Sequence, residues 1–452
     1  MQDYTRSLSS ASICTDEGPK IPEATCFRLG QLQGATKTLF PSLTRLDFTN
    51  KIPGSSPFHL PFLFSPALRE VVIVNVGTFT VSAFLHRLGE EATLEHLTLD
   101  SLHLTRHLMK GIGHCRQLKT LNLNKLKVSL DGLDVLMMLG VLSGLHDLRI
   151  AVEHDVDYSQ ACSSPLPSNP PLDSLKLTAL KKLQLVGERP MVQDILDLVL
   201  FSRTLETLLV CLTGYRYYLP APVPPRRKLN KKLPKKHAQT PEVDRDQDFV
   251  ETIANGLATT LKSFTLKFDA TNLANIRMPR NTIINLVELK NLENLDLSGI
   301  LLPIKCLDST FNTLRGLWPK VQHLRLPSVS ENYLSLSTLA VIANSCPSLI
   351  FLECCIDLQK SFSAPADRMV FHRLKTLVIR SPGSPSQLSQ QQSDTRPARA
   401  IANFLYALFP DIVSIIDIHQ SQFWGEVSEL VQMCRQAREY DRKREMQRQD
   451  GK

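Results

Sequence analysis

Apolar residues recur along the chain in a six-residue pattern, Leu-x-x-Leu-x-Leu, in which other apolar residues can replace the leucines. Leu118, Leu121 and Leu123 form a regular copy. Twelve copies can be followed, and their first residues are Leu43, Leu68, Leu94, Leu118, Leu145, Leu180, Leu205, Leu261, Leu292, Val321, Leu349 and Leu374. A weaker thirteenth copy begins at Ile412. The alternation of apolar and polar positions within each copy predicts a short β-strand with one buried face.

The segments between these strands also match one another. Apolar residues at helical spacing occur in Val81–Leu88, Met191–Phe201, Phe249–Leu257 and Leu336–Asn344. A unit of one strand and one helix, repeated every 24 to 27 residues over the first five copies, fits the period of roughly 20–29 residues that is typical of leucine-rich repeats. Unrelated amphipathic strands are the alternative, and the matching helices argue against it. We therefore predict an α/β fold, a leucine-rich-repeat solenoid (horseshoe) with one parallel sheet on the concave face and helices on the convex face.

Proline marks the start of several units. It stands two residues before the first apolar residue of a strand at Pro41, Pro66, Pro319, Pro347 and Pro410. Proline lacks an N–H group and disfavours helical conformation in the residue before it. We therefore expect each of these prolines to end one helix and to lead into the next strand.

Three segments interrupt the period. Residues 153–171, 215–248 and 381–397 are rich in polar residues and proline, a composition that buries little apolar surface. Each begins shortly after a strand and before the next helix. Because insertions in repeat arrays collect on one face, we expect three loops along one edge of the solenoid.

The two ends of the chain differ from the repeats. Residues 1–38 are expected to be a disordered N-terminus with a short capping helix around Cys26, Leu29 and Leu32. The solenoid of about 12–13 irregular repeats is expected to cover residues 39–420. Residues 421–452 predict a capping helix and a polar tail that end the array.

The formal net charge of +8 is concentrated in one place. Between Arg216 and Lys236 lie eight basic residues and no acidic one, so the rest of the chain is balanced. We call the densest part the basic loop, with Arg226, Arg227, Lys228, Lys231, Lys232, Lys235 and Lys236. A solvated loop, a nuclear import signal and a patch for an acidic partner or nucleic acid all stay open. Because no basic face follows the repeats, nucleic acid is not the expected partner.

The strand pattern also indicates which side chains face outward. With Leu121 and Leu123 buried, Thr120 and Asn122 must point to the concave face. The same position in every unit forms a central row of Asp47, Val72, Thr98, Asn122, Arg149, Gln184, Leu209, Thr265, Asp296, Arg325, Glu353 and Val378. Its mixture of charged, amide and apolar groups suits a protein ligand better than a phosphate backbone. The residues predicted to contact a partner are Thr120, Asn122, Arg149, Gln184, Leu209, Arg325 and Glu353.

Catalytic and metal-binding patterns are missing from the sequence. It has no phosphate-binding glycine motif, no His-Glu-x-x-His, no Gly-x-Ser-x-Gly and no Cys-x-x-Cys. His103 and His107 could share a helical face, but zinc needs four convergent ligands and no second cluster supports this pair. Cys354 and Cys355 are interpreted as one inward and one outward strand residue. We expect neither an enzyme nor a metal or cofactor.

The repeat phrases Phe40–Leu46 and Cys346–Leu352 and the C-terminal stretch Phe409–Arg438 resemble fungal F-box proteins with C-terminal leucine-rich repeats. This resemblance implies a substrate receptor of a cullin-type ubiquitin ligase, in which an F-box binds the ligase adaptor and the repeats hold the substrate. No F-box is recognisable among the 42 residues before Leu43, so a truncated or F-box-less member is expected and adaptor binding stays open.

The predicted function is therefore a protein-protein interaction scaffold related to such receptors. The alternatives are a nuclear scaffold or nucleic-acid-associated protein that uses residues 226–236, and a small-GTPase regulator of the repeat type. Scattered cysteines, the absence of a leader and the absence of a long apolar run indicate a cytoplasmic or nuclear protein without a membrane span.

Overall fold

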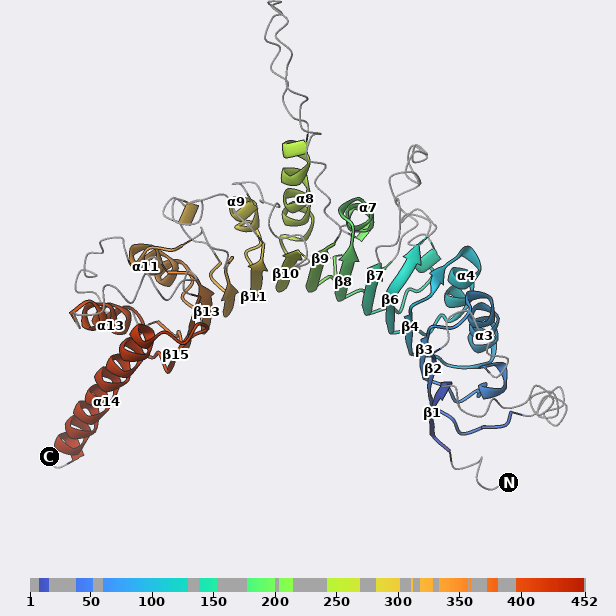
Figure 1. Cartoon of the computed structure of the whole chain (residues 1–452), viewed down its shortest axis with the longest axis horizontal. Helices are drawn as coiled ribbons and strands as arrows, with labels where there is room; N and C mark the ends of the chain where they lie inside the picture. Colours follow the sequence, from blue (N-terminus) through green and yellow to red (C-terminus); the bar gives the residue numbers. More distant parts are fainter. Residues whose placement is uncertain are drawn as a thin grey trace, which may run out of the picture. The chain divides into compact units, whose positions relative to one another are not determined.

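The computed structural model describes residues 8–15, 38–51, 60–128, 138–152, 177–199, 203–213, 242–268, 282–300, 310–311, 318–327, 333–356, 358, 372–380 and 396–450. The chain forms two compact units, Met1–Tyr215 and Arg216–Lys452. Both are built from parallel strands and helices, and in each unit the helices lie on one side of the strands, except for the C-terminal helix Gln422–Asp450, which projects from the end of the second unit (Figure 1). The chain is an α/β leucine-rich-repeat solenoid, as the repeated apolar pattern predicts.

The first unit contains a parallel sheet in the order β1-β2-β3-β4-β6-β7-β8-β9, with β5 beside β6. Its strands are β1 (Ser10–Thr15), β2 (Arg45–Asn50), β3 (Glu70–Val74), β4 (His96–Asp100), β5 (His103–Leu104), β6 (Thr120–Val128), β7 (Asp147–Val152), β8 (Lys182–Gly187) and β9 (Thr207–Leu212). Its helices are η1 (Leu60–Leu63), α3 (Thr78–Glu91), α4 (Arg106–His114) and α7 (Arg189–Val199).

The second unit contains a parallel sheet in the order β10-β11-β12-β13-β14-β15. Its strands are β10 (Ser263–Phe268), β11 (Asn294–Gly299), β12 (His323–Arg325), β13 (Phe351–Cys354), β14 (Thr376–Ile379) and β15 (Ser414–Asp417). Its helices are α8 (Glu242–Leu257), α9 (Thr282–Leu286), α11 (Leu336–Ser345), α13 (Arg396–Leu408) and α14 (Gln422–Asp450).

The core lies between the strands and the helices of each unit. The first apolar residue of each of the twelve copies is buried, and so are the other two apolar residues of the same copy. Full burial of one such leucine contributes about 1.5–3 kcal/mol. Equivalent positions pair across neighbouring strands, so that Leu97 lies beside Leu121 and Leu121 beside Leu148. The repeat therefore builds continuous rows of apolar side chains that no single unit could form alone.

A tight turn leads into most strands. In the proline-containing units, the N–H of the first apolar residue donates to the carbonyl oxygen of the residue before the proline, as in Leu43 to Phe40 (3.2 Å) and Leu349 to Cys346 (3.1 Å). This places proline at the second position of a four-residue turn, where its fixed φ is favoured. The same bond joins Leu118 to Cys115 (3.1 Å) in a unit without proline.

Several predicted boundaries were wrong. Ser10–Thr15 forms β1 beside β2, although a disordered segment was predicted there. Ala11 and Ile13 are half-buried, and the unpaired edge of β2 supplies the backbone partners that a polar strand needs. Helix α8 begins at Glu242, inside the loop predicted at 215–248, and its later turns bury Val250, Ile253 and Leu257.

Other predictions fall outside the described residues or need correction. The loop at 153–171, most of the other two loops, the basic loop and the expected helix near Cys26 lie outside the described residues. Helix α13 begins at Arg396, one residue before the end predicted for the third loop. Cys354 and Cys355 do not alternate between inside and outside. Both are buried, and β13 ends at Cys354, so Cys355 no longer belongs to the strand whose alternation was predicted.

Candidate partner-binding surface

In each unit, the residues of the predicted central row lie next to one another on adjacent strands. In the first unit Asp47 pairs with Val72, Val72 with Thr98, and Thr98 with Asn122. The row continues through Arg149, Gln184 and Leu209. These side chains are exposed or half-buried, whereas their strand neighbours in the core are buried. Thr120 lies in the adjacent row on the same side of the sheet, between His96 and Asp147.

Few direct contacts join the side chains of this row in the first unit. The Nδ2 of Asn122 donates to the Oγ1 of Thr98 at 3.3 Å. Arg45 forms ion pairs with Asp47 (3.2 Å) and with Glu70 on the next strand (3.0 Å). Arg149 is exposed, and no carboxylate in the described part of the chain pairs with it. A cation of this kind is available to a ligand.

A second polar row follows the start of the strands in the first unit. Glu95 accepts from the Nζ of Lys119 at 2.6 Å and from the Nη1 of Arg69 at 2.9 Å. The hydrogen bond from Lys119 is the main reason that the pKa of Glu95 is lowered. All three side chains are partly exposed, so the attraction is screened by water and ions. This triad therefore orders the strand edge more than it stabilises the fold.

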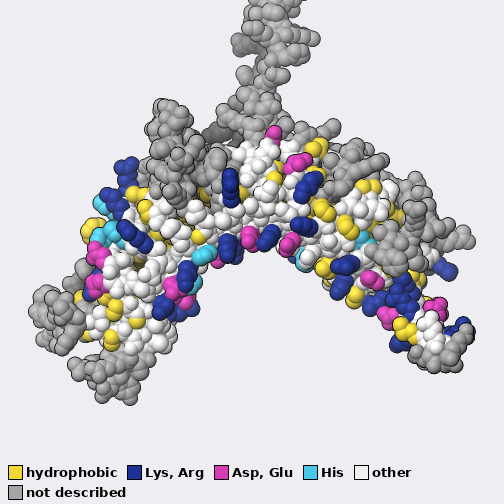
Figure 2. All heavy atoms as spheres, turned by 180° about the vertical axis from the view of Figure 1, so that it is seen from behind, with side chains coloured by type: hydrophobic (Ala, Val, Ile, Leu, Met, Phe, Trp, Pro, Cys, Tyr) yellow, Lys and Arg dark blue, Asp and Glu magenta, His cyan; other side chains and the backbone are white. Residues whose placement is uncertain are grey.

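In the second unit the strand surface carries a ladder of alternating charges, which we call the charge ladder: Lys267, Asp296, Arg325, Glu353 and Arg380. The Nζ of Lys267 lies 3.0 Å from the Oδ2 of Asp296, and the Nη1 of Arg325 lies 3.6 Å from the same oxygen. The Nε of Arg325 lies 3.3 Å from the Oε2 of Glu353, and the Nε of Arg380 donates to the Oε1 of Glu353 at 2.7 Å. Basic and acidic side chains alternate along the strand-lined edge in Figure 2.

The carboxylates of the charge ladder lie beneath its cations. The side chains of Asp296 and Glu353 are 16% and 7% exposed, whereas those of Lys267, Arg325 and Arg380 are 40%, 47% and 37% exposed. Glu353 was predicted to meet a partner directly, but the two arginines cover it. Its role in this structure is to hold both guanidinium groups, which are the surface that a partner would meet.

Hydrogen bonding keeps Asp296 ionised. Burial would raise its pKa, but the Oγ and backbone N of Ser298 donate to its Oδ1 at 2.7 and 3.1 Å, and Lys267 donates to it as well. These interactions outweigh burial, and the pKa of Asp296 is lowered. An ionised Asp296 is a fixed counterion for Lys267 and Arg325.

Aromatic and apolar groups border the charge ladder. The guanidinium of Arg325 lies 5.4 Å from the ring centre of Phe351, within the range of a cation–π contact, and the ring of His323 lies 6.1 Å from the same ring. The central row then ends on β15 at Ile416, which pairs with Val378 and is 47% exposed. The surface therefore changes from charged at β12 to apolar at β15.

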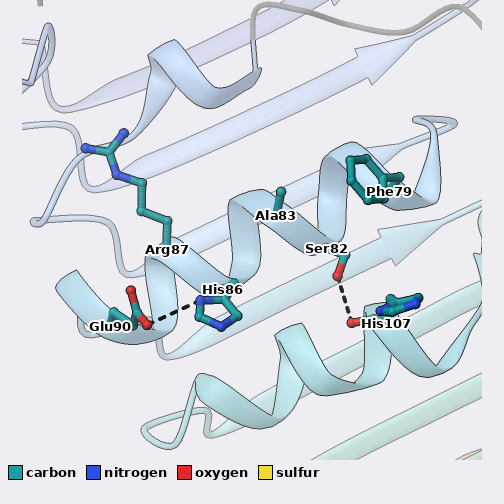
Figure 3. A pocket seen from close by; sticks show the side chains of 7 residues that line it. All are labelled: Phe79, Ser82, Ala83, His86, Arg87, Glu90 and His107. Carbon is teal, nitrogen blue, oxygen red and sulfur yellow. Dashed lines mark hydrogen bonds and ion pairs between the residues drawn. The ribbon is translucent and has the colours of Figure 1, made fainter. Parts of the chain in front are cut away.

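The helical side of the first unit contains a shallow pocket that the sequence pattern did not indicate. Phe79, Ser82, Ala83, His86, Arg87, Glu90 and His107 line it, from helices α3 and α4 (Figure 3). The Nδ1 of His86 lies 3.4 Å from the Oε1 of Glu90, and the Oγ of Ser82 donates to the carbonyl of His107 at 2.7 Å. Phe79 is 83% exposed. The position of Phe79 outside the buried stripe of α3 was the one feature of the sequence that could have indicated this pocket.

The histidine pair weighed as a metal site is not on one helix. His103 belongs to β5, whereas His107 belongs to α4. Among the described residues, no group of three or more His, Cys, Asp or Glu side chains could hold a metal ion. Within the same residues, no helix is both long and apolar enough to cross a membrane.

Comparison with known proteins gives the following. No protein-family model matches the sequence, and none of the curated proteins matches it. Among solved structures, the leucine-rich-repeat protein LegL7 from Legionella pneumophila is 14% identical with a TM-score of 0.33, over 74% of this chain and 90% of that one. A leucine-rich-repeat protein from Leptospira interrogans is 15% identical with a TM-score of 0.31, over 89% and 100%. These likenesses concern the fold.

A third similar structure is the ectodomain of the plant receptor kinase GASSHO1/SCHENGEN3 from Arabidopsis thaliana, in complex with CASPARIAN STRIP INTEGRITY FACTOR 2. It is 15% identical with a TM-score of 0.29, and the match covers 91% of this chain and 47% of the ectodomain. Identities and TM-scores this low assign no function to the chain, so the function has to be argued from its own surface.

Proposed function

We propose that the chain is a protein-binding scaffold that holds a protein partner against the strand-lined face of its repeats. The observation that carries the proposal is the central row of unlike side chains, which lie next to one another on neighbouring strands while every alternate side chain is buried. Rows of varied polar, charged and apolar groups suit the mixed contacts of a protein interface. The proposal assigns binding, and no catalysis, to this surface.

Arginines are the residues from which the largest effects are expected, because arginine is enriched among the residues that dominate binding energy. Arg149 in the first unit and Arg325 in the second are exposed members of the central row. Thr120, Asn122, Gln184 and Leu209 complete the proposed contact surface in the first unit. Glu353 acts through Arg325 and Arg380.

The test compares charge reversals on the two sides of the sheet. Arg149→Glu and Arg325→Glu in the tagged full-length chain should each reduce the amount of co-purified partner about tenfold or more. Arg399→Glu, on the exposed side of helix α13, is the matched control and should leave recovery unchanged. Equal recovery from all three variants, with unchanged circular dichroism, would refute the proposal.

A finer proposal is that the partner is a substrate of a cullin-type ubiquitin ligase. It rests on the resemblance of the repeats and the C-terminal stretch to F-box receptors, and it places the chain in the cytoplasm or nucleus. Buried Cys115 and Cys346 form no disulfide, which suits a reducing compartment. Mixing the purified chain with the ligase adaptor tests it. Failure to form a complex would contradict the ligase role and leave the scaffold proposal intact.

A further inference from the structure

The charge ladder presents an uneven charge to solvent. Its two carboxylates are largely buried, and its three cations are well exposed. A ligand approaching the sheet therefore meets ammonium and guanidinium groups that are already held in place. Arginines fixed by internal carboxylates lose little side-chain entropy on binding, so an anionic ligand is favoured here.

The donors of the two arginines are only partly used. Arg380 donates to Glu353 through Nε and Nη2, and Arg325 approaches carboxylates through Nε and Nη1. A guanidinium carries five N–H donors, so each arginine keeps N–H groups that these carboxylates do not use. A carboxylate can accept two parallel N–H bonds from such a group.

An apolar site lies at a fixed distance from these cations. Arg325 on β12 is aligned through Glu353 and Val378 with Ile416 on β15. Three strand spacings correspond to about 14 Å, which an extended peptide covers in about four residues. Phe351 provides a further apolar surface beneath Arg325.

We propose that the strand face of the second unit binds an acidic peptide segment, with a carboxylate side chain over Arg325 and an apolar side chain about four residues away over Ile416. The inference rests on the proposed function and names the chemistry of the partner. A peptide is favoured over nucleic acid because the ladder has only three exposed cations and the row then becomes apolar at Ile416, whereas a phosphate backbone is bound by a longer run of cations.

The experiment uses the full-length chain and a short fluorescent peptide that has two adjacent glutamates and a leucine about four residues further on. Fluorescence anisotropy should show binding that weakens with added salt, as expected for exposed charges. Replacing the glutamates by lysines should abolish binding. Replacing the leucine by serine should weaken it about fivefold.

Variants locate the site. Arg325→Gln should weaken the glutamate peptide about tenfold, and Arg325→Lys should give an intermediate loss because it keeps the charge but loses the planar donors. Ile416→Ser should remove the difference between the leucine and serine peptides. Lys119→Gln, which removes a similarly exposed and paired cation of the first unit, is the matched control and should have no effect.

Two results of the direct binding measurements would overturn the inference, and a competition experiment separates it from the proposed function. One is equal binding of the glutamate and lysine peptides. The other is tighter binding of single-stranded oligothymidylate than of the glutamate peptide, which would make the site one for nucleic acid. If the co-purified partner depends on Arg149 and Arg325 but is not displaced by the glutamate peptide, the scaffold proposal stands and the acidic-segment inference fails. If recovery of the partner does not depend on these arginines and the glutamate peptide does not displace it, both proposals fail.

Discussion

At the scale of single residues, the leucines and their neighbours do different work. The leucines of the repeat are buried in every described strand from β2 to β14 and carry the fold. The residues between them lie on the other side of the sheet, where most are at least partly exposed and Glu353 and Val378 are buried, and they carry whatever specificity the surface has. The alternation of side chains along a strand therefore identifies both the buried leucines and the residues between them.

Leu121→Ala tests the first half of this division. Leu121 is fully buried between its counterparts on β4 and β7, so its truncation should lower the free energy of unfolding by about 2–5 kcal/mol. Urea denaturation followed by circular dichroism measures the loss. Thr120→Ala, at the half-buried neighbouring position, should change it by less than about 0.5 kcal/mol. A similar loss for both variants would contradict the division.

Asp296 links the charge ladder to pH. Its pKa is lowered in the folded chain, so its ionised form contributes stability above the pKa of the unfolded state, and this contribution is lost as the pH falls through the folded pKa. Asp296→Asn should therefore lower stability at pH 7 and reduce the further loss between neutral and acidic pH. Denaturation midpoints at several pH values measure both effects. An unchanged pH dependence would show that the ion pairs of Asp296 do not form in solution.

Prediction at the residue scale ended where geometry beyond the strand pattern was needed. The central row was predictable from the alternation of side chains along each strand alone. The charge ladder was not, because Lys267 on β10 and Arg380 just after β14 lie two positions after the central-row residues and reach across to Asp296 and Glu353. The register between β10 and β11 also shifts after Thr265, so that Lys267 pairs with Gly299. No spacing in the sequence indicates that shift.

At the scale of elements, strong apolar periodicity predicted the structure and weak periodicity did not. Helices α3, α7 and α11 lie where their apolar stripes predicted them. Strands β1 and β5 were missed, because β1 buries its inward residues only halfway and β5 is two residues long. Pairing with a neighbouring strand, and not the sequence of either segment, determines their conformation.

The packing of α3 against α4 depends on one glycine. A Cβ on Gly89 would lie 2.5 Å from the Cβ and 2.6 Å from the carbonyl carbon of His114, so the helices would have to separate. Gly89→Ala should lower stability by about 1–3 kcal/mol. At Gly425, within helix α14, an added Cβ meets nothing within 4 Å, so Gly425→Ala serves as the control and should be neutral or stabilising. Thermal unfolding of both variants gives the comparison, and equal midpoints would argue against this helix contact.

At the scale of the whole molecule, the charge distribution separates two functions. The eight basic residues from Arg216 to Lys236 equal the entire net charge, and seven of them belong to the basic loop, whereas the strand faces carry both signs. Deleting residues 226–236 should leave binding of the protein partner within about twofold, because the proposed surface lies on the strands. Loss of binding on deletion, measured by the same co-purification, would favour the nuclear or nucleic-acid alternative.

The central claim is that the partner lies against the strands and not against the helices. The most direct measurement is site-specific photocrosslinking of the full-length chain in cell extract, with the photoreactive residue at Gln184 on the strand face or at exposed Ala83 on the helical side. The expected result is a crosslinked protein of one defined mass from position 184 and none from position 83. A crosslink from position 83 alone would contradict the claim and would place the partner over the pocket at Phe79 and His107.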